Sequence, residues 1–237
     1  MNTTTMTAQP AAAAAAGTVA PTKVRWKIFL MMLFLISINY IDRASLSVAM
    51  PLIAKEFDVG PALQGVLLSS FFWTYAAMQI PGGMLADRFG PRVVIAGATL
   101  GWGFFQAIAA VCTGWFALLL TRLGLGAAEA PIYPAGGKLN GIWMTQTERG
   151  RGATLLDGGA PLGAALGAIL ISGLIATLGS WRLSFVVAGV GTMAAGWLAW
   201  RYIRNHPRQH PAVNDAEASY IERSHGADAA AEAPNAS

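Results

Sequence analysis

The 237-residue sequence contains little charge, one cysteine and three histidines. Charged residues make up 12% of the chain, about half of the roughly 25% found in soluble domains, which argues against a water-soluble enzyme. The single cysteine, Cys112, rules out an intramolecular disulfide and metal sites built from several cysteines. All three histidines follow residue 205. We therefore expect no metal, no cofactor and no enzymatic activity, because Ser-His and Cys-His catalytic sets are missing as well.

Apolar residues are abundant, at 54% of the chain, and the mean hydropathy is +0.48. Each apolar stretch of about 20 to 25 residues is long enough to cross ~30 Å of hydrocarbon as a helix, and none alternates as a strand would. Residues 23–204 are therefore predicted to form an all-α integral membrane domain with six transmembrane helices. The predicted spans are 26–50, 62–86, 93–112, 115–137, 153–176 and 182–202.

Polar segments flank this domain. Residues 1–22 are rich in Thr and Ala and have no basic start, so we predict a disordered cytoplasmic tail and not a secretory signal. Residues 205–237 are predicted to be a second polar cytoplasmic tail.

The basic residues lie mainly on one side of the predicted spans, which explains the net charge of +4 without a nucleic-acid partner. This asymmetry predicts cytoplasmic termini, in a plasma (inner) membrane. One side holds Lys23, Arg25, Lys27, Arg88, Arg92, Lys138, Arg149, Arg151, Arg201, Arg204 and Arg208, and the other holds Lys55 and Arg182.

Four charged residues stand deep inside predicted spans, away from their ends: Asp42 and Arg43 in the first, and Arg122 and Glu129 in the fourth. Each costs about 2.5–3.5 kcal/mol at a helix centre if it faces lipid, so we expect all four to face protein or water. Arg122 and Glu129 share a helix face because they are seven residues apart. The four charges fall at a similar depth, which predicts one buried cluster that binds an organic anion and exchanges a proton. The alternative is a set of static ion pairs between helices.

Three further polar residues are candidates for the same site. Asn39 and Tyr40 precede the charged pair of the first span, and ordinary interhelical hydrogen bonds are their alternative role. Asp157 either lines the cavity or caps the entry to the fifth span. The small residues that follow Asp157 predict close helix packing.

The sequence between the second and third spans, GMLADRFGPR at residues 83–92, resembles the signature loop of the major facilitator superfamily. Gly83 and Gly90 permit a tight turn between helices. Asp87 is expected to meet a helix N-terminus, and Arg88 and Arg92 to meet acidic or carbonyl partners on moving helices. The family pattern continues with another basic residue, where this chain has Val93.

A narrower resemblance, to the anion:cation symporter branch, rests on Asn39-Tyr40-Ile41-Asp42-Arg43, on Glu129 and on the segment that begins at Asp157. It covers about residues 23–223 and implies the N-terminal half of a transporter, built as two inverted three-helix repeats. The tail after residue 205 then resembles the start of a central loop.

This resemblance also implies a function, the transport of a sugar acid or other organic anion with protons. Asp42 and Glu129 would couple to protons, and Arg43 and Arg122 would be their partners or contact the anion. The expected partners are the anion, protons, the lipid bilayer, and a second six-helix half or another copy of the chain. Alternatives are a non-transporting remnant or subunit, and a sugar-phosphate exchanger.

Overall fold

The computed structural model describes residues 20–232, with side chains through residue 226, and its regular elements are all helical. The predicted all-α class is therefore confirmed for this part of the chain. The long helices are α1 (Val24–Phe57), α2 (Pro61–Phe89), α3 (Pro91–Ile108), α4 (Trp115–Glu129), α5 (Ile132–Trp143), α6 (Arg149–Leu178), α7 (Trp181–Tyr202) and α8 (Asp215–Glu232). Two short 3-10 helices, η1 (Ala109–Val111) and η2 (Pro207–Gln209), complete the set.

The predicted fourth span, 115–137, differs most from the structure, because the helix is interrupted after Glu129 and resumes as α5. Pro131 and Pro134 lack the backbone N–H groups that a continuous helix needs at these positions. The Pro131 carbonyl instead accepts the N–H of Ala135 at 3.0 Å. Gly82 of α2 lies against this break, and a Cβ atom at Gly82 would stand 2.8 Å from the Pro131 Cα.

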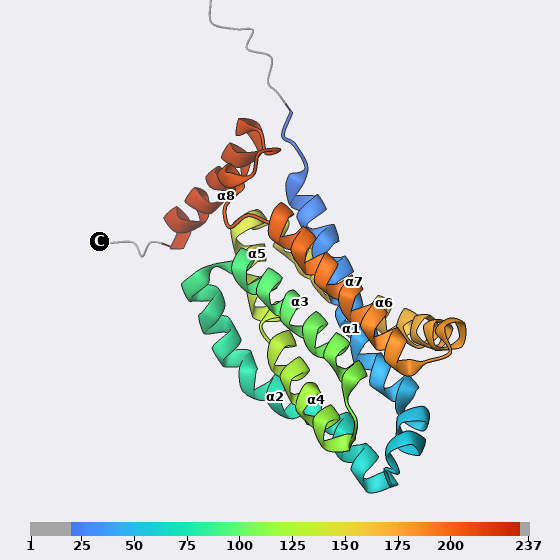
Figure 1. Cartoon of the computed structure of the whole chain (residues 1–237). Helices are drawn as coiled ribbons and strands as arrows, with labels where there is room; N and C mark the ends of the chain where they lie inside the picture. The colour runs from blue at the N-terminus through green and yellow to red at the C-terminus, as the bar shows by residue number, and fades with distance from the viewer. Residues whose placement is uncertain (1–19, 233–237) are drawn as a thin grey trace, which may run out of the picture.

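The helices pack in three main pairs: α1 with α6, α2 with α4, and α3 with α7 (Figure 1). If α1, α2 and α3 are exchanged in that order with α4, α6 and α7, the same three pairs result. Two inverted three-helix repeats have this symmetry. Small residues permit the close contact of α1 with α6. Gly159, Gly163 and Gly167 all face α1, and a Cβ at Gly159 would lie 2.6 Å from the Leu33 carbonyl oxygen. The predicted packing role of this segment is confirmed.

The beginning of α1, the α2–α3 and α5–α6 connections and the end of α7 share one end of the bundle, called here the α8 end (Figure 1). At the opposite end, Arg182 at the start of α7 pairs with Glu56 of α1 at 2.6 Å. Arg182 also donates to the Cys112 carbonyl after α3 at 2.7 Å. Helix direction thus alternates as the predicted topology requires.

Four helical segments of the described chain are long and apolar enough to cross a membrane: Val24–Phe57, Pro91–Val111, Arg149–Leu178 and Trp181–Tyr202. The other two predicted spans correspond to α2, which has 29 residues, and to the interrupted α4–α5 pair. The apolar helices support an integral membrane protein. The count of six spans stays a prediction.

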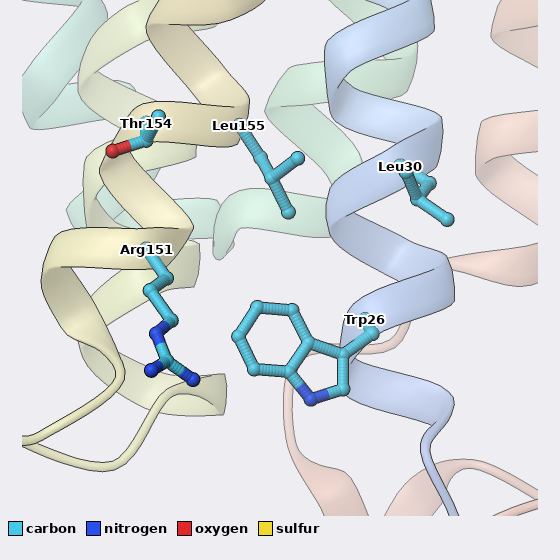
Figure 2. Close-up of a pocket in the computed structure, with 5 residues that line it drawn as sticks. All are labelled: Trp26, Leu30, Arg151, Thr154 and Leu155. Atoms are coloured by element: carbon cyan, nitrogen blue, oxygen red, sulfur yellow. The ribbon is translucent and has the colours of Figure 1, made fainter.

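A groove of about 440 Å³ lies between α1 and α6 near the α8 end (Figure 2). Trp26 and Leu30 line it from α1, and Leu155 lines it from α6. Arg151 and Thr154 of α6 complete its lining. The groove is therefore largely apolar, with one cation at its edge.

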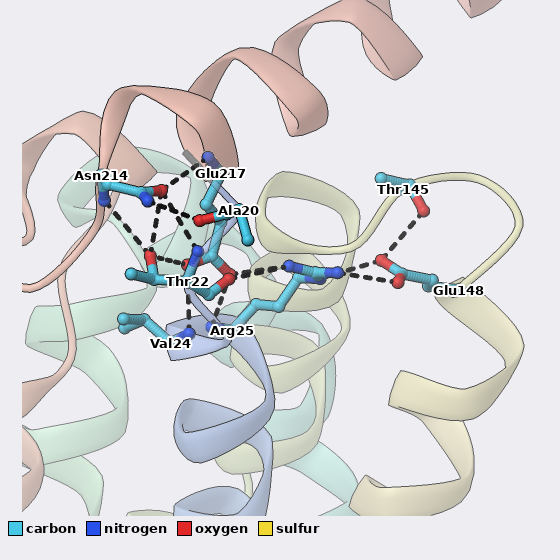
Figure 3. A network of polar contacts seen from close by, with 8 residues as sticks. All are labelled: Ala20, Thr22, Val24, Arg25, Thr145, Glu148, Asn214 and Glu217. Carbon is cyan, nitrogen blue, oxygen red and sulfur yellow. Dashed lines mark hydrogen bonds and ion pairs between the residues drawn. The ribbon is translucent and has the colours of Figure 1, made fainter. Parts of the chain in front are cut away.

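Helix α8 is held at its end of the bundle by a polar network (Figure 3). Arg25 of α1 binds Glu148 through two hydrogen bonds of 2.9 Å, and binds Glu217 of α8 at 2.8 Å. Burial acts to raise the pKa of Glu148, but its hydrogen bonds to Arg25 and Thr145 outweigh this effect and hold the pKa below its ordinary value. Three separate segments are thus joined through one guanidinium group.

This network changes the interpretation of both predicted tails. Thr22 and Asn214 exchange hydrogen bonds of 3.2 Å, and Asn214 also donates to the Ala20 carbonyl at 2.8 Å. Residues 20–22 are therefore held in place and do not belong to a disordered tail, and the second tail contains a helix. These contacts form because Asn214 and Glu217 carry oxygen atoms that accept hydrogen bonds from residues at or just before the start of α1, where the side chain of Lys23 provides no cap. The rest of the first predicted tail, residues 1–19, lies outside the described residues.

Candidate functional site

Buried polar residues occupy a layer between two apolar cores. In α1, one core ends at Ile36 and the other begins at Leu46, so the polar layer falls at the middle of this helix. The layer draws on α1, α2, α3, α4 and α7. Its buried polar members are Ser37, Asn39, Asp42, Ser45, Ser70, Gln106, Arg122, Glu129 and Thr192.

The first part of the site is an ion pair between Arg43 and Glu129. The Arg43 Nε atom lies 2.8 Å from the Glu129 Oε2 atom, and the Glu129 side chain is completely buried. The guanidinium carbon of Arg43 lies 4.7 Å from the ring centre of Tyr40, 4.8 Å from Phe71 and 4.5 Å from Tyr75. This aromatic cage stabilises the cation, whose side chain is 15% exposed. Tyr40 thus contacts Arg43 directly, and its role in binding a substrate stays a prediction.

Asp42 points away from this pair. Its Oδ2 atom accepts hydrogen bonds from Trp102 Nε1 at 3.1 Å and Thr192 Oγ1 at 2.8 Å, which come from α3 and α7. Adjacent residues of an α-helix project about 100° apart, so Asp42 and Arg43 face different neighbours. The charges therefore form two hydrogen-bonded groups on two sides of α1, and their predicted role as one substrate- and proton-binding cluster stays a prediction.

Arg122 lies within electrostatic range of both groups. It is 4% exposed, and it is attracted by Glu129 and Asp42 and repelled by Arg43. Its guanidinium carbon stands 5.5 Å from the centre of the Phe71 ring. Among the four charged residues, all of which the structure describes, only Arg43 and Glu129 form a direct ion pair.

Several buried polar atoms of the layer have no hydrogen-bond partner among the described residues. The donors are Nδ2 of Asn39, Nη2 of Arg43, and Nε and Nη1 of Arg122. The acceptors are Oδ1 of Asn39, Oε1 of Glu129 and Oε1 of Gln106. Leaving a buried polar group unpaired costs about 1–3 kcal/mol. A ligand or water with complementary groups would therefore be favoured here.

Asp157 lies outside this buried layer. It is exposed, on the ninth residue of α6, whose N-cap is Glu148. A residue so far into the helix cannot satisfy the free N–H groups of its first turn. The predicted capping role is therefore wrong, and a place on the cavity wall is the role that stays a prediction.

The α2–α3 connection places its signature residues at the α8 end. Gly90 has φ +81°, and a Cβ atom there would lie 2.7 Å from the Asn205 side chain, so this position requires glycine. Arg92 donates to the Trp200 carbonyl at 3.1 Å, as expected of an arginine that meets a carbonyl partner.

Asp87 does not meet a helix N-terminus. Its carboxylate pairs with Lys138 of α5 at 2.9 Å, and Lys138 also donates to the Ala86 carbonyl at 3.1 Å. The expectation for Asp87 is therefore corrected, because a long lysine side chain reaches the turn. Arg88 lies 5.4 Å from the centre of the Phe89 ring, and Gly83 faces Pro134 of α5.

Comparison with known proteins agrees with these features. The family model of the Major Facilitator Superfamily matches residues 32–234. A probable galactarate/D-glucarate transporter of Bacillus subtilis (strain 168) is 34% identical over 213 residues, which cover 86% of this chain and 46% of the relative. A probable L-galactonate transporter of Escherichia coli (strain K12) is 32% identical, with coverage of 84% of this chain and 43% of the relative. This chain spans about half the length of the curated relatives it matches.

Solved structures share the fold. A bacterial homologue of the human lysosomal transporter Spinster, inward-facing and unoccupied, superposes with a TM-score of 0.73 at 22% identity, covering 80% of this chain and 45% of that protein. The proton:xylose symporter XylE, bound to 6-bromo-6-deoxy-D-glucose, gives 0.70 at 15% identity and covers 85% of this chain and 49% of XylE. The signature connection, the helical fold and the family match together show that this chain belongs to the Major Facilitator Superfamily.

Proposed function

We propose that this chain forms the N-terminal half of a secondary active transporter that carries an organic anion, such as a sugar acid, together with protons. The observation that carries the proposal is the buried Arg43–Glu129 pair, beside which Arg43 and Arg122 retain unpartnered donors. The relatives named as galactarate/D-glucarate and L-galactonate transporters support a sugar acid as the anion.

The chemistry of the layer suits such a substrate. A guanidinium group binds a carboxylate through two parallel hydrogen bonds, and Arg43 and Arg122 offer three unpartnered N–H donor atoms. The amide of Asn39 supplies a donor and an acceptor for hydroxyl groups, since both of its polar atoms are buried and unpartnered. A neutral sugar would leave the two arginines without a new partner.

Charge balance provides the coupling. Two arginines and two acids give the polar layer no net charge, and Glu129 pairs with Arg43 at 2.8 Å. Protonation of Glu129 removes its negative charge and releases Arg43 for the substrate carboxylate. One proton therefore compensates one negative charge on the anion, which avoids an unbalanced charge in the membrane.

The other half of the cavity wall would come from a second six-helix unit or another copy of this chain. Asp157 on the exposed face of α6 is our candidate for the wall that faces it. The basic residues of the α8 end favour a cytoplasmic position for that end, in the plasma membrane. In a Cys112→Ala background, cysteines at Gln146 and at Ala62 should then be labelled from the inside and the outside, respectively.

Proteoliposome uptake tests the transport proposal. Labelled D-glucarate and D-glucose are offered with and without a pH gradient, to this chain alone and together with a matching C-terminal half. We expect a pH gradient to drive uptake of D-glucarate but not of D-glucose, and Arg43→Gln should abolish this uptake. Glu129→Gln should abolish gradient-driven uptake but permit exchange of labelled for unlabelled substrate. Arg201→Gln, at an exposed arginine outside the layer, is the matched control and should leave uptake unchanged.

Three outcomes would reject parts of this proposal. Gradient-driven uptake that survives Glu129→Gln would make this acid structural. Preference for a sugar phosphate over glucarate would favour an exchanger. A correctly folded pair of halves that binds and carries no anion would favour a non-transporting subunit.

A further inference from the structure

The groove between α1 and α6 combines apolar walls with a cation at one end. Figure 2 shows Trp26 and Arg151 reaching into the gap from opposite helices, with the indole nitrogen and the guanidinium group toward the end where α1 begins. Leu155 lies above them in Figure 2, and Leu30, 55% exposed, also lines the groove from α1. Such a site matches a ligand with a polar head and an apolar body.

The cation of this groove is available. Among the described residues, the Arg151 side chain makes no hydrogen bond or ion pair, and it is exposed. Glu148, the nearest acid along the chain, is already bound by Arg25 through both carboxylate oxygens. Charge complementarity therefore favours an anionic group beside Arg151, and a guanidinium binds a phosphate especially well.

The apolar wall continues toward the middle of the bundle. Trp26, Leu30, Phe34 and Ile38 are spaced by four residues, so they form one row along α1. Phe34 and Ile38 line a second groove of about 320 Å³, which α6 and α7 complete and which reaches Asp42. From Trp26 to Ile38 the row rises about 18 Å, close to the roughly 15 Å occupied by the chains of one leaflet.

We propose that this surface binds an anionic phospholipid, with the phosphate on Arg151 beside Trp26 and one acyl chain along Leu30 and Phe34 toward Ile38. The chain would end over the second groove and cover the side of Asp42 that lies there. The site requires only that the helices lie in a membrane. It is independent of the proposed transport function, and its test uses binding alone.

Native mass spectrometry of the full chain in detergent, titrated with phosphatidylglycerol or phosphatidylcholine, tests the site. We expect phosphatidylglycerol to bind at least fivefold more tightly. Arg151→Gln should weaken its binding about fivefold, which corresponds to about 1 kcal/mol for one basic contact. Lys27→Gln, at an exposed cation of the same end, should change it less than twofold. Leu30→Trp should fill the groove and abolish binding, whereas Leu198→Trp, on the exposed face of α7, should not.

Circular dichroism should be used to check that each variant folds. We expect all of them to fold, because the substituted side chains are all exposed. Equal losses for Arg151→Gln and Lys27→Gln would overturn the proposal, since they would show a general attraction to cations. Displacement of the lipid by glycerol phosphate would also overturn it, because the headgroup alone would then suffice. A dimer of the chain that Leu30→Trp dissociates would instead assign the groove to a second copy.

Discussion

Glu217 is predicted to control the docking of α8 on the bundle. Its completely buried carboxylate accepts hydrogen bonds from Thr22 Oγ1 at 2.6 Å, Val24 N at 3.1 Å, Arg25 N at 3.2 Å and Arg25 Nη1 at 2.8 Å. Two of these donors are backbone N–H groups of the first turn of α1, whose own N-cap, Lys23, provides no side-chain cap. A residue nearly two hundred positions away thus caps α1.

The substitution Glu217→Ala removes all four hydrogen bonds. It leaves Arg25 with one acid in place of two, and leaves the N–H groups of Val24 and Arg25 without an acceptor. Breaking a buried pair by removing one partner costs about 3–5 kcal/mol. Because each 1.4 kcal/mol is a factor of ten, the open, undocked form of α8 should become roughly a hundredfold to a few thousandfold more populated.

Hydrogen–deuterium exchange of the full chain measures this change. Peptides from α8 and from the first turn of α1 should exchange faster by that factor, while peptides around Glu56 at the opposite end should not change. Glu222→Ala is the matched control, because Glu222 is exposed on the same helix and pairs with exposed Arg208. We expect less than a threefold effect from it. Equal acceleration by both variants would refute the capping role of Glu217.

Three further predictions concern the same fold. The pKa of Glu148 is held below its ordinary value, so the stability that this residue contributes is complete above about pH 4.5 and is lost as the pH falls further. The hydrogen–deuterium exchange of α8, corrected for intrinsic rates, should therefore become faster below that pH. Gly90→Ala should cost about 1–3 kcal/mol, seen as a lower melting temperature, and removing the Asn205 side chain should restore only part of it because φ stays at +81°. Gly163→Val should separate α1 from α6 and reduce the melting temperature, whereas Gly173→Val, with open space around it, should not.

The helices could be predicted because each must be apolar over the thickness of a membrane. The start of α2 follows from Gly60 and Pro61, and the turn into α3 follows from Gly90 and Pro91. Helices α1, α2 and α6 extend beyond the predicted spans at both ends, since hydrogen bonding continues past the apolar part of each, whereas α3 ends four residues before the predicted end at residue 112. The break after Glu129 was missed, although Pro131 signals it, because hydropathy alone does not register a missing N–H group.

The depth of the site was predictable, but its contacts were not. Positions along a helix fix how deep Asp42 and Arg43 lie, while the neighbour that each meets depends on how the helices pack. Trp102, Thr192 and Tyr75 therefore escaped prediction. A tryptophan or threonine in an apolar helix fits ordinary packing as well as it fits a hydrogen bond to a buried acid, and no sequence spacing distinguishes the two cases.

The separation of the charges has a consequence for the proposed coupling. Arg43 faces Glu129 and the aromatic rings, whereas Asp42 is held by Trp102 and Thr192 on α3 and α7. Under the proposed coupling, a substrate carboxylate that displaced Glu129 from Arg43 would act on the α4 side of α1, and its effect would reach Asp42 through Arg122 and through α1 itself. Glu129 would then respond to the anion by direct contact, while Asp42 would respond through the electrostatic field and the position of its helix. The two acids are therefore expected to serve different steps, despite lying in one polar layer.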